Sequence, residues 1–231
     1  MSRRVLVSWS SGKDSAWTLH RLRQEPGVEV GALLTTFNEA AERVAMHAVR
    51  ADLVRAQAAA AGLPLWEVPL PSPCSNAEYE TRMAAAVQRA CAEGFTHVAF
   101  GDLFLEDVRR YREERLAGTG LDPMFPLWGL DTASLAREMI GAGVGAILTC
   151  VDPRKVEAAL AGRDYDIPLL AALPDTVDPC GERGEFHTFV WDGPMFRAPV
   201  PVERGVVVER DGFVFADLMA AGGHPAAAGR S

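Results

Sequence analysis

The stretch Val5-Leu-Val-Ser-Trp-Ser-Ser-Gly-Lys-Asp-Ser15 joins a short apolar run to a loop of small polar residues, and it decides the fold. The apolar run predicts a buried strand, and the residues from Ser15 onward predict a helix. A loop of this composition between a strand and a helix lets backbone N–H groups approach an anion closely. We therefore expect a phosphate site at the carboxyl end of the first strand of a parallel sheet.

The loop does not fit two common nucleotide-binding motifs. The ordinary P-loop, G-x-x-x-x-G-K-[ST], needs a glycine where Val7 stands and a Ser or Thr where Asp14 follows Lys13. The dinucleotide fingerprint G-x-G-x-x-G needs three glycines, and the loop has only Gly12. Both motifs are therefore rejected.

The hexapeptide SSGKDS does fit the PP-loop, S-G-G-x-D-S, of enzymes that cleave ATP between its α- and β-phosphates. Ser11 replaces the first glycine, where serine adopts a positive φ less readily. Lys13 adds positive charge, and Asp14 is expected to hold Mg²⁺ against the departing pyrophosphate. An ordinary strand-to-helix turn capped by serines is the alternative. The loop residues expected to bind ATP are Ser10, Ser11, Gly12, Lys13, Asp14 and Ser15.

The composition of the 231-residue chain is that of a globular protein, with 48% hydrophobic and 23% charged residues. The net charge of −8 gives no general attraction to nucleic acid or to an anionic membrane. No apolar window approaches a membrane span, and the N-terminal apolar run is too short for a signal peptide. The four cysteines form no C-x-x-C pair, which argues against a zinc site. We therefore expect a soluble, cytoplasmic protein.

Short β-rich runs alternate with helical stretches over the first two thirds of the chain. This alternation predicts a doubly wound α/β fold, with a mainly parallel sheet covered on both faces. The predicted strands are residues 4–9, 28–37, 65–68, 96–100 and 144–151, and the predicted helices are residues 15–24, 42–61, 76–93, 106–117 and 132–141.

The character of the chain changes after about residue 160, where Pro, Gly and Asp become frequent. Asp211-Gly212 stands between two β-rich runs and predicts a two-residue hairpin turn. The last residues are small, lack periodicity and predict a disordered tail. The expected division is residues 1–160 for an ATP-binding domain, 161–220 for a smaller β-containing element at the substrate site, and 221–231 for the tail.

Three later motifs accompany the loop: GDLFLEDVRRYREERL (residues 101–116), PLWG (126–129) and CGERGEFHTFVWDGP (180–194). Together with SSGKDS they resemble the diphthine–ammonia ligase family, also called ATP-binding-domain-4 or N-type ATP pyrophosphatases, of the PP-loop adenine nucleotide α-hydrolase superfamily. The resemblance covers roughly residues 4–194. It implies a HUP-type, Rossmann-like fold and an adenylation: a carboxylate attacks the α-phosphorus of ATP, pyrophosphate leaves, and ammonia displaces AMP to form an amide.

The second motif supplies several candidate site residues. Asp102 ends the fourth predicted strand and is expected to position magnesium or substrate, while Gly101 permits close approach of ATP. Glu106, Arg109 and Glu113 share one helix face at spacings of 3 and 4, and the resemblance implies that they border the acceptor site. Ordinary ion pairs on a solvated helix are the alternative.

Other candidates come from the acidic loop and the second strand. Glu182 and Glu185 lie among glycines and are expected to orient ammonium or the acceptor. His187 departs from the Glu-Tyr-Glu-Thr-like run of eukaryotic and archaeal members and is expected to contact the acceptor. Thr35 and Asn38 are expected to contact adenine. The expected catalytic residues are Lys13, Asp14, Asp102, Glu106, Arg109, Glu182 and Glu185.

Two other functions share this fold. A nucleotide sensor would hold ATP without turnover, but it has no need of so many carboxylates near polyphosphate. A tRNA-thiolating enzyme would need a catalytic cysteine pair, and Cys180 has no obvious partner. We therefore expect an AMP-forming carbon–nitrogen ligase that uses ATP, Mg²⁺, ammonium and a small-molecule or protein carboxylate. The Ala- and Arg-rich sequence is typical of a bacterial member, for which the acceptor can differ from diphthine; a homodimer is left open.

Overall fold

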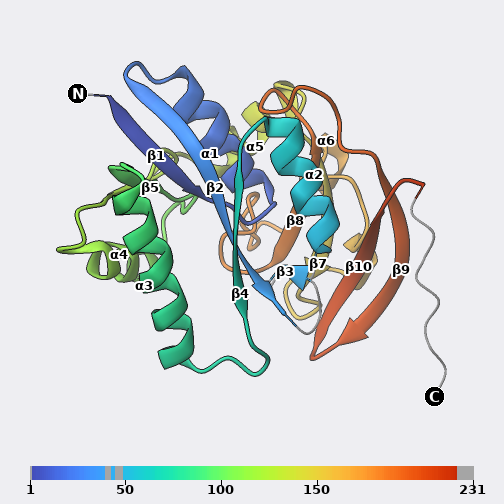
Figure 1. Ribbon diagram of the computed structural model, residues 1–231. Coiled ribbons are helices and arrows are strands. Elements are labelled where there is room, and N and C mark those ends of the chain that lie inside the picture. Colours follow the sequence, from blue (N-terminus) through green and yellow to red (C-terminus); the bar gives the residue numbers. More distant parts are fainter. Residues whose placement is uncertain (1, 40–42, 45–48, 223–231) are drawn as a thin grey trace.

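The computed structural model describes residues 2–39, 43–44 and 49–222. The strands of the larger of its two sheets are β1 (Arg3–Ser8), β2 (Val28–Asn38), β3 (Arg43–Val44), β4 (Leu65–Leu70), β5 (His97–Ala99) and β6 (Asp122–Met124). Their order is β3-β2-β1-β5-β6, with β4 paired to β2 (Figure 1). All pairs are parallel except β2 with β3. The predicted mainly parallel sheet is confirmed.

Helices cover both faces of this sheet, as a doubly wound fold requires. They are α1 (Lys13–Gln24), α2 (Ala51–Ala61), α3 (Asn76–Ala92) and α4 (Glu106–Leu116). Because side chains alternate along a strand, Val5 and Val7 of β1 join the core under α1 and α2. Leu6 joins the separate core under α3 and α4. The two cores account for the doubly wound architecture.

A second sheet is antiparallel and has the order β8-β7-β10-β9. Its strands are β7 (Gly145–Val151), β8 (Phe186–Asp192), β9 (Val202–Arg210) and β10 (Phe213–Ala220). Helices α1 and α2 lie between the two sheets, with α1 against β8 and α2 against β10 (Figure 1). The predicted hairpin turn is confirmed, because Asp211 and Gly212 have φ values of 54° and 78° between β9 and β10.

Strand β7 forms where it was predicted, but its place in the parallel sheet was wrong. It pairs antiparallel with β8 and β10. Nearly all of its residues are buried, and a strand buried on both faces gives the same continuous apolar run in either kind of sheet. The domain boundary at residue 160 stays a prediction, and most of the expected tail lies outside the described residues.

The helix predicted for residues 42–61 is shorter in the structure. Arg43 and Val44 pair with Asn38 and Phe37, and α2 begins only at Ala51. The physical reason is that β1 pairs with β2 only as far as Leu34, which leaves the end of β2 open for another strand. Residues 40–42 and 45–48 lie outside the described part of the chain.

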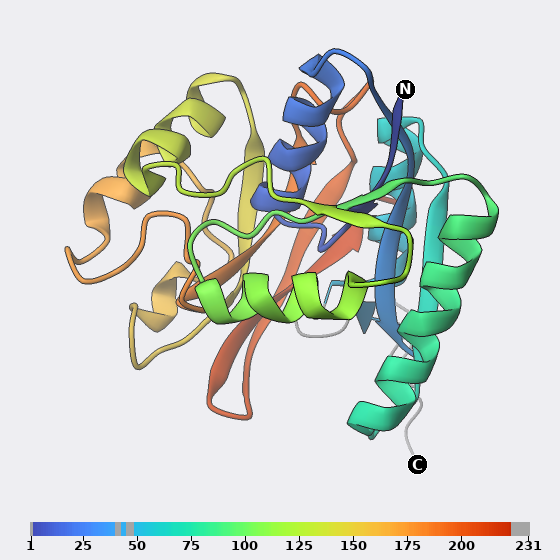
Figure 2. The ribbon, with the colours of Figure 1, turned by 90° about the vertical axis from the view of Figure 1, so that its left-hand side faces the viewer.

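The two helices on the outer face of the parallel sheet, α3 and α4, run in different directions. In Figure 2, α3 runs alongside the strands whereas α4 lies crosswise to them. The chain continues through α5 (Thr132–Gly141), a short 3₁₀ turn (Ala158–Leu160) and α6 (Ile167–Ala172) into the antiparallel sheet. No helix in the described ranges has the length and apolar character needed to span a membrane.

Candidate functional site

The loop after β1 turns sharply into α1. β1 ends at Ser8 and α1 begins at Lys13, two residues before the helix start expected from the sequence. Ser11 has a φ of 69°, in the left-handed region, at the position where the PP-loop motif carries a glycine. Gly12 precedes the helix in an extended conformation and provides no side-chain cap for its first turn. This arrangement suits an anion at the N-terminus of α1.

Two residues that the sequence did not single out fasten this loop. The buried Gln57 of α2 donates from Nε2 to the carbonyls of Ser11 (3.0 Å) and Val190 (2.6 Å), and its Oε1 accepts from Trp9 Nε1 (2.9 Å). Thr188 Oγ1 accepts from the backbone N–H of Lys13 at 3.1 Å. The loop is thereby tied to strand β8 of the second sheet. No local pattern marks a glutamine in an alanine-rich helix for this role.

Lys13 and Asp14 form a close ion pair beside the loop. Lys13 Nζ lies 2.9 and 2.8 Å from the two carboxylate oxygens of Asp14 and also donates to the carbonyl of Cys180. Its ammonium group lies 5.6 Å from the ring centroid of Tyr165 and 5.7 Å from that of Phe186. The buried lysine therefore faces the second sheet, and each of its polar contacts is to protein.

The charges of this pair are coupled. Burial opposes the charge of Lys13, but the attraction of Asp14, Cys180 and Glu182 outweighs it and raises the pKa of the lysine. Burial raises the pKa of the Asp14 carboxyl, and the attraction of Lys13 offsets only part of that effect. Each group therefore favours the charged form of the other.

Glu182 reaches the same place from the acidic loop before β8. Its Oε1 accepts from the backbone N–H of Leu103 at 2.8 Å, and its own N–H donates to Asp178 Oδ2 at 2.8 Å. Burial raises the pKa of the Glu182 carboxyl to about 7, and the nearby Asp14 and Asp102 carboxylates add to this shift. Glu182 is thus a carboxyl group that gains and loses its proton near neutral pH.

Glu185 and His187 follow Glu182 along the chain. Glu185 is buried; its Oε1 accepts from the backbone N–H of Asp178 at 3.2 Å, and its Oε2 has no hydrogen-bond partner among the described residues. Burial, helped by the charge of Lys13, lowers the pKa of His187 to about 4. His187 is therefore a neutral side chain at neutral pH.

Gly101 and Asp102 follow β5, and Gly101 lies against the backbone of the loop. A Cβ atom on Gly101 would lie 2.9 Å from the backbone carbon of Asp14 and 3.0 Å from the backbone nitrogen of Ser15. Gly101 therefore permits a close approach to the loop backbone itself. Asp102 Oδ2 accepts from Nε of Arg112 at 2.9 Å, so this carboxylate positions a cation that the sequence did not single out.

The three residues of α4 predicted to border the acceptor have other surroundings in the structure. Glu106 and Glu113 are exposed, and Arg109 Nε pairs with Glu113 Oε1 at 2.7 Å, an ordinary i,i+4 pair. Arg109 also lies over the rings of Phe125 (4.9 Å) and Trp128 (4.7 Å). The structure thus supports the ion-pair alternative for Arg109 and Glu113.

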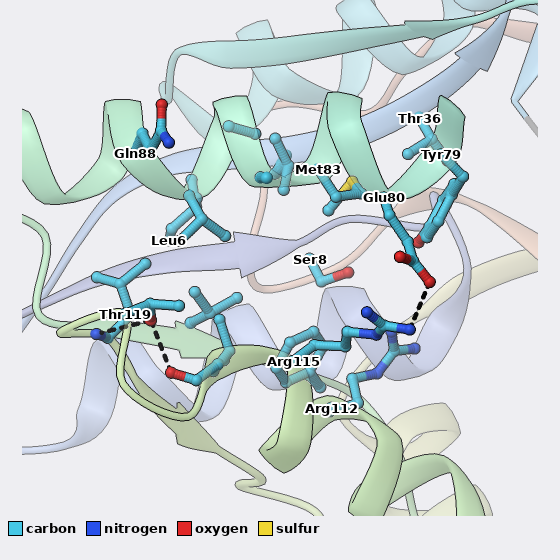
Figure 3. Close-up of a pocket in the computed structure, with 18 of the residues that line it drawn as sticks. Leu6, Ser8, Thr36, Tyr79, Glu80, Met83, Gln88, Arg112, Arg115 and Thr119 are labelled. Atoms are coloured by element: carbon cyan, nitrogen blue, oxygen red, sulfur yellow. Dashed lines mark hydrogen bonds and ion pairs between the residues drawn. The ribbon is translucent and has the colours of Figure 1, made fainter. Parts of the chain in front are cut away.

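A pocket of about 900 Å³ opens between α3, α4 and the outer face of the parallel sheet. Figure 3 shows Ser8 and Thr36 in its wall, with Arg112 and Arg115 on the α4 side and Tyr79 and Glu80 on the α3 side. Its apolar floor consists of alternate residues of three strands and one helix: Leu6, Leu34, Val98, Phe100 and Leu116. The pocket reaches Ser10 at the start of the loop and is within the usual size range of ligand sites.

Thr35, which the sequence places at adenine, does not line this pocket, whereas its neighbour Thr36 does. Thr35 is instead buried and donates to the carbonyl of Trp9 at 2.7 Å. The reason is strand alternation, which sends neighbouring side chains to opposite faces. Asn38 ends β2 and pairs with Leu70 of β4.

The thiol of Cys180 is not placed for nucleophilic chemistry. It is buried, its Sγ donates to the carbonyl of Thr132 at 3.4 Å, and burial raises its pKa to about 12. The described part of the chain holds no group of three or more His, Cys, Asp or Glu residues able to bind a metal ion. The tRNA-thiolation alternative therefore loses its only candidate nucleophile in this loop.

Fold and loop together define an α/β protein of the PP-loop class. The N-terminal domain of the diphthamide synthase family matches residues 3–121, and the C-terminal domain of the same family matches residues 131–214. The chain therefore belongs to the diphthamide synthase family, which confirms the resemblance seen in the four motifs.

Individual relatives are similar over about half of the chain. Diphthine–ammonia ligase of Rattus norvegicus is 31% identical over 120 residues, which cover 49% of this chain and 45% of the relative. The Homo sapiens protein is 30% identical over 128 residues, with 49% and 45% covered, and the Danio rerio protein is 31% identical over 127 residues, with 49% and 47% covered. The chain spans about half the length of the curated relatives it matches.

Proposed function

We propose that this chain is an ATP-dependent amide ligase that adenylates a carboxylate and passes the acyl group to ammonia. The observation that carries the proposal is the PP-loop: its Ser10 lines a pocket large enough for a nucleotide, and its Lys13 and Asp14 form a charged cluster with Glu182. The relatives named as diphthine–ammonia ligases support the same reaction class. The acceptor is a small-molecule or protein carboxylate, which need not be diphthine.

In the proposed complex the adenosine occupies the pocket beside Thr36, and the phosphates extend along the loop. The backbone N–H groups at the start of α1 and the hydroxyl of Ser10 would bind the phosphate oxygens. The buried hydroxyl of Ser15 donates to the carbonyl of Gly12 at 3.0 Å and so holds the loop in shape. Ser11 contributes through its backbone conformation, because its left-handed φ turns the loop. Gly101 keeps the end of β5 close to the same backbone.

Asp14 is the residue that would hold Mg²⁺. Magnesium binds carboxylate oxygen and substrate phosphates with few protein ligands, so one or two carboxylates at this place fit it. When bound, the ion would offset the charge of the leaving pyrophosphate, and Lys13, released from Asp14, would pair with the same phosphates.

Glu182 is the proposed proton acceptor for the attacking ammonium. Ammonium must lose a proton before its nitrogen can attack the acyl-adenylate carbonyl, and a carboxylate with a pKa near 7 can take that proton at neutral pH. Glu185 and the neutral His187 would line the path of the ammonium or the acceptor. Glu106, Arg109 and Glu113 would contact only an acceptor large enough to reach the surface of α4.

Replacing Glu182 by glutamine tests this role through the pH profile. The wild-type rate of amide formation is expected to rise with pH and to level off above about 7, because Glu182 accepts a proton only when ionised. Glu182→Gln is expected to lower the rate about 100-fold and to remove this inflection. Rates are compared at a constant concentration of ammonium, the ion from which Glu182 takes the proton. An unchanged inflection in the variant would assign the titration to another group.

The reaction itself is tested with ATP labelled at the α-phosphate. With ammonium, Mg²⁺ and a panel of carboxylates, the expected products are AMP and pyrophosphate. ADP and phosphate would contradict the proposal. Tightly retained ATP with no AMP release for any carboxylate would favour the nucleotide sensor instead.

A further inference from the structure

The pocket between α3 and α4 has cations of its own. Among the described residues that line it, Arg112 and Arg115 are the two basic side chains, and both come from α4 (Figure 3). Lys13, the cation expected from the sequence motif, does not line the pocket and is turned toward Asp14 and Cys180. The positive charges nearest to a nucleotide in the pocket would therefore be those of the two α4 arginines, not that of Lys13.

Arg112 is held by two contacts, and part of its guanidinium group makes no hydrogen bond among the described residues. Its Nε donates to Asp102 Oδ2 at 2.9 Å, and the guanidinium lies 4.5 Å from the ring centroid of Phe100. Its two terminal nitrogens make no hydrogen bond within the described part of the chain. Asp102 follows Gly101, which lies against the backbone of Asp14 and Ser15. Arg112 also lines the same pocket as Ser10 of the loop. Two parallel N–H groups of this kind match the geometry of a phosphate.

Arg115 differs from Arg112 in its exposure and in the use of its terminal nitrogen. Its side chain is 51% exposed, and its terminal nitrogen is paired with Glu80 of α3. The guanidinium also lies 5.2 Å from the ring centroid of Tyr111. This pair crosses the pocket from α4 to α3, as Figure 3 shows, and satisfies the charge of Arg115 without a ligand.

We propose that Arg112 binds the α-phosphate of the nucleotide and stabilises the charge that develops there during adenylation. This inference rests on the proposed function. In the step concerned, a carboxylate oxygen forms a bond to the α-phosphorus while the bond to the bridging oxygen breaks, and that electron pair leaves with pyrophosphate. The non-bridging oxygens of the α-phosphate carry the charge, and Arg112 donates to them. Lys13 and the loop serve the pyrophosphate end.

The contact can be measured without knowing the acceptor. The binding of adenosine, AMP and pyrophosphate to the full chain is compared by calorimetry for the wild type, Arg112→Gln, Arg112→Lys and the control Arg110→Gln. Arg110 is exposed on α4 and does not line the pocket. The wild type is expected to bind AMP more tightly than adenosine, because only AMP carries the α-phosphate.

Arg112→Gln is expected to weaken the binding of AMP about tenfold to a hundredfold and to leave the affinities for adenosine and pyrophosphate unchanged. Arg112→Lys is expected to retain part of the preference, since it keeps the charge but loses the fork, and Arg110→Gln is expected to match the wild type. An unchanged ratio of AMP to adenosine affinity in Arg112→Gln would overturn the proposal. So would an equal loss of both ligands, which would assign Arg112 to the shape of the pocket. A wild type that binds none of adenosine, AMP and pyrophosphate would instead refute the proposed function.

Discussion

Gly101→Ala is expected to lower AMP formation about 100-fold while the chain stays folded. The added methyl group would lie 2.9 Å from the backbone carbon of Asp14, 3.0 Å from the nitrogen of Ser15 and 3.1 Å from the carbonyl oxygen of Asp14. All three are main-chain atoms, so the loop must move away from β5. A misplacement of about 1 Å at a reacting centre costs about two orders of magnitude in rate. Steady-state AMP release measures the effect.

A matched control separates this steric effect from the general cost of losing a glycine. Gly141 lies in α5, and a Cβ atom there would have no neighbour within 4 Å. Gly141→Ala is expected to keep full activity and to unfold at the same or a slightly higher temperature. Gly101→Ala is expected to lose about 1–3 kcal/mol of stability from overpacking. Wild-type turnover in Gly101→Ala would show that the loop tolerates displacement and that Gly101 does not set the site.

The sequence predicted those parts of the site that follow from one continuous segment. The SSGKDS loop comes directly after an apolar run and before a helix, so its place at the end of β1 follows from local pattern alone. The acidic loop around Glu182 precedes β8 as predicted, and Glu182 reaches the same cluster as Asp14.

The residues that the sequence missed depend on which distant elements meet. On α4, spacing selects Arg109 with Glu113, yet the arginines that line the pocket are Arg112 and Arg115, and Arg112 pairs with Asp102, which follows β5. Gln57 is identified only when α2 is seen to lie against Trp9, Ser11 and Val190 at once. Such roles come from tertiary contacts, which hydrophobic periodicity does not encode.

Replacing Lys13 by methionine is expected to abolish AMP formation, with a loss of at least about 1,000-fold, and to destabilise the chain. Methionine keeps the apolar stem but removes the charge that pairs with Asp14 and the donor to the Cys180 carbonyl. Breaking a buried ion pair by removing one partner costs about 3 kcal/mol, because the other charge stays behind without compensation. Thermal unfolding and AMP release measure the two effects separately.

The double variant Lys13→Met/Asp14→Asn distinguishes a structural pair from a catalytic one. It removes both charges, so its stability is expected to return to within about 1 kcal/mol of the wild type. Its activity is expected to remain lost, because the pyrophosphate would then lack both its cation and the carboxylate proposed to hold Mg²⁺. Arg55→Gln, which opens the exposed pair with Glu67, is the control and is expected to change stability by less than about 1 kcal/mol. A stable double variant that forms AMP at the wild-type rate would restrict Lys13 and Asp14 to holding the loop against the second sheet, because charge at the pyrophosphate would then come from elsewhere.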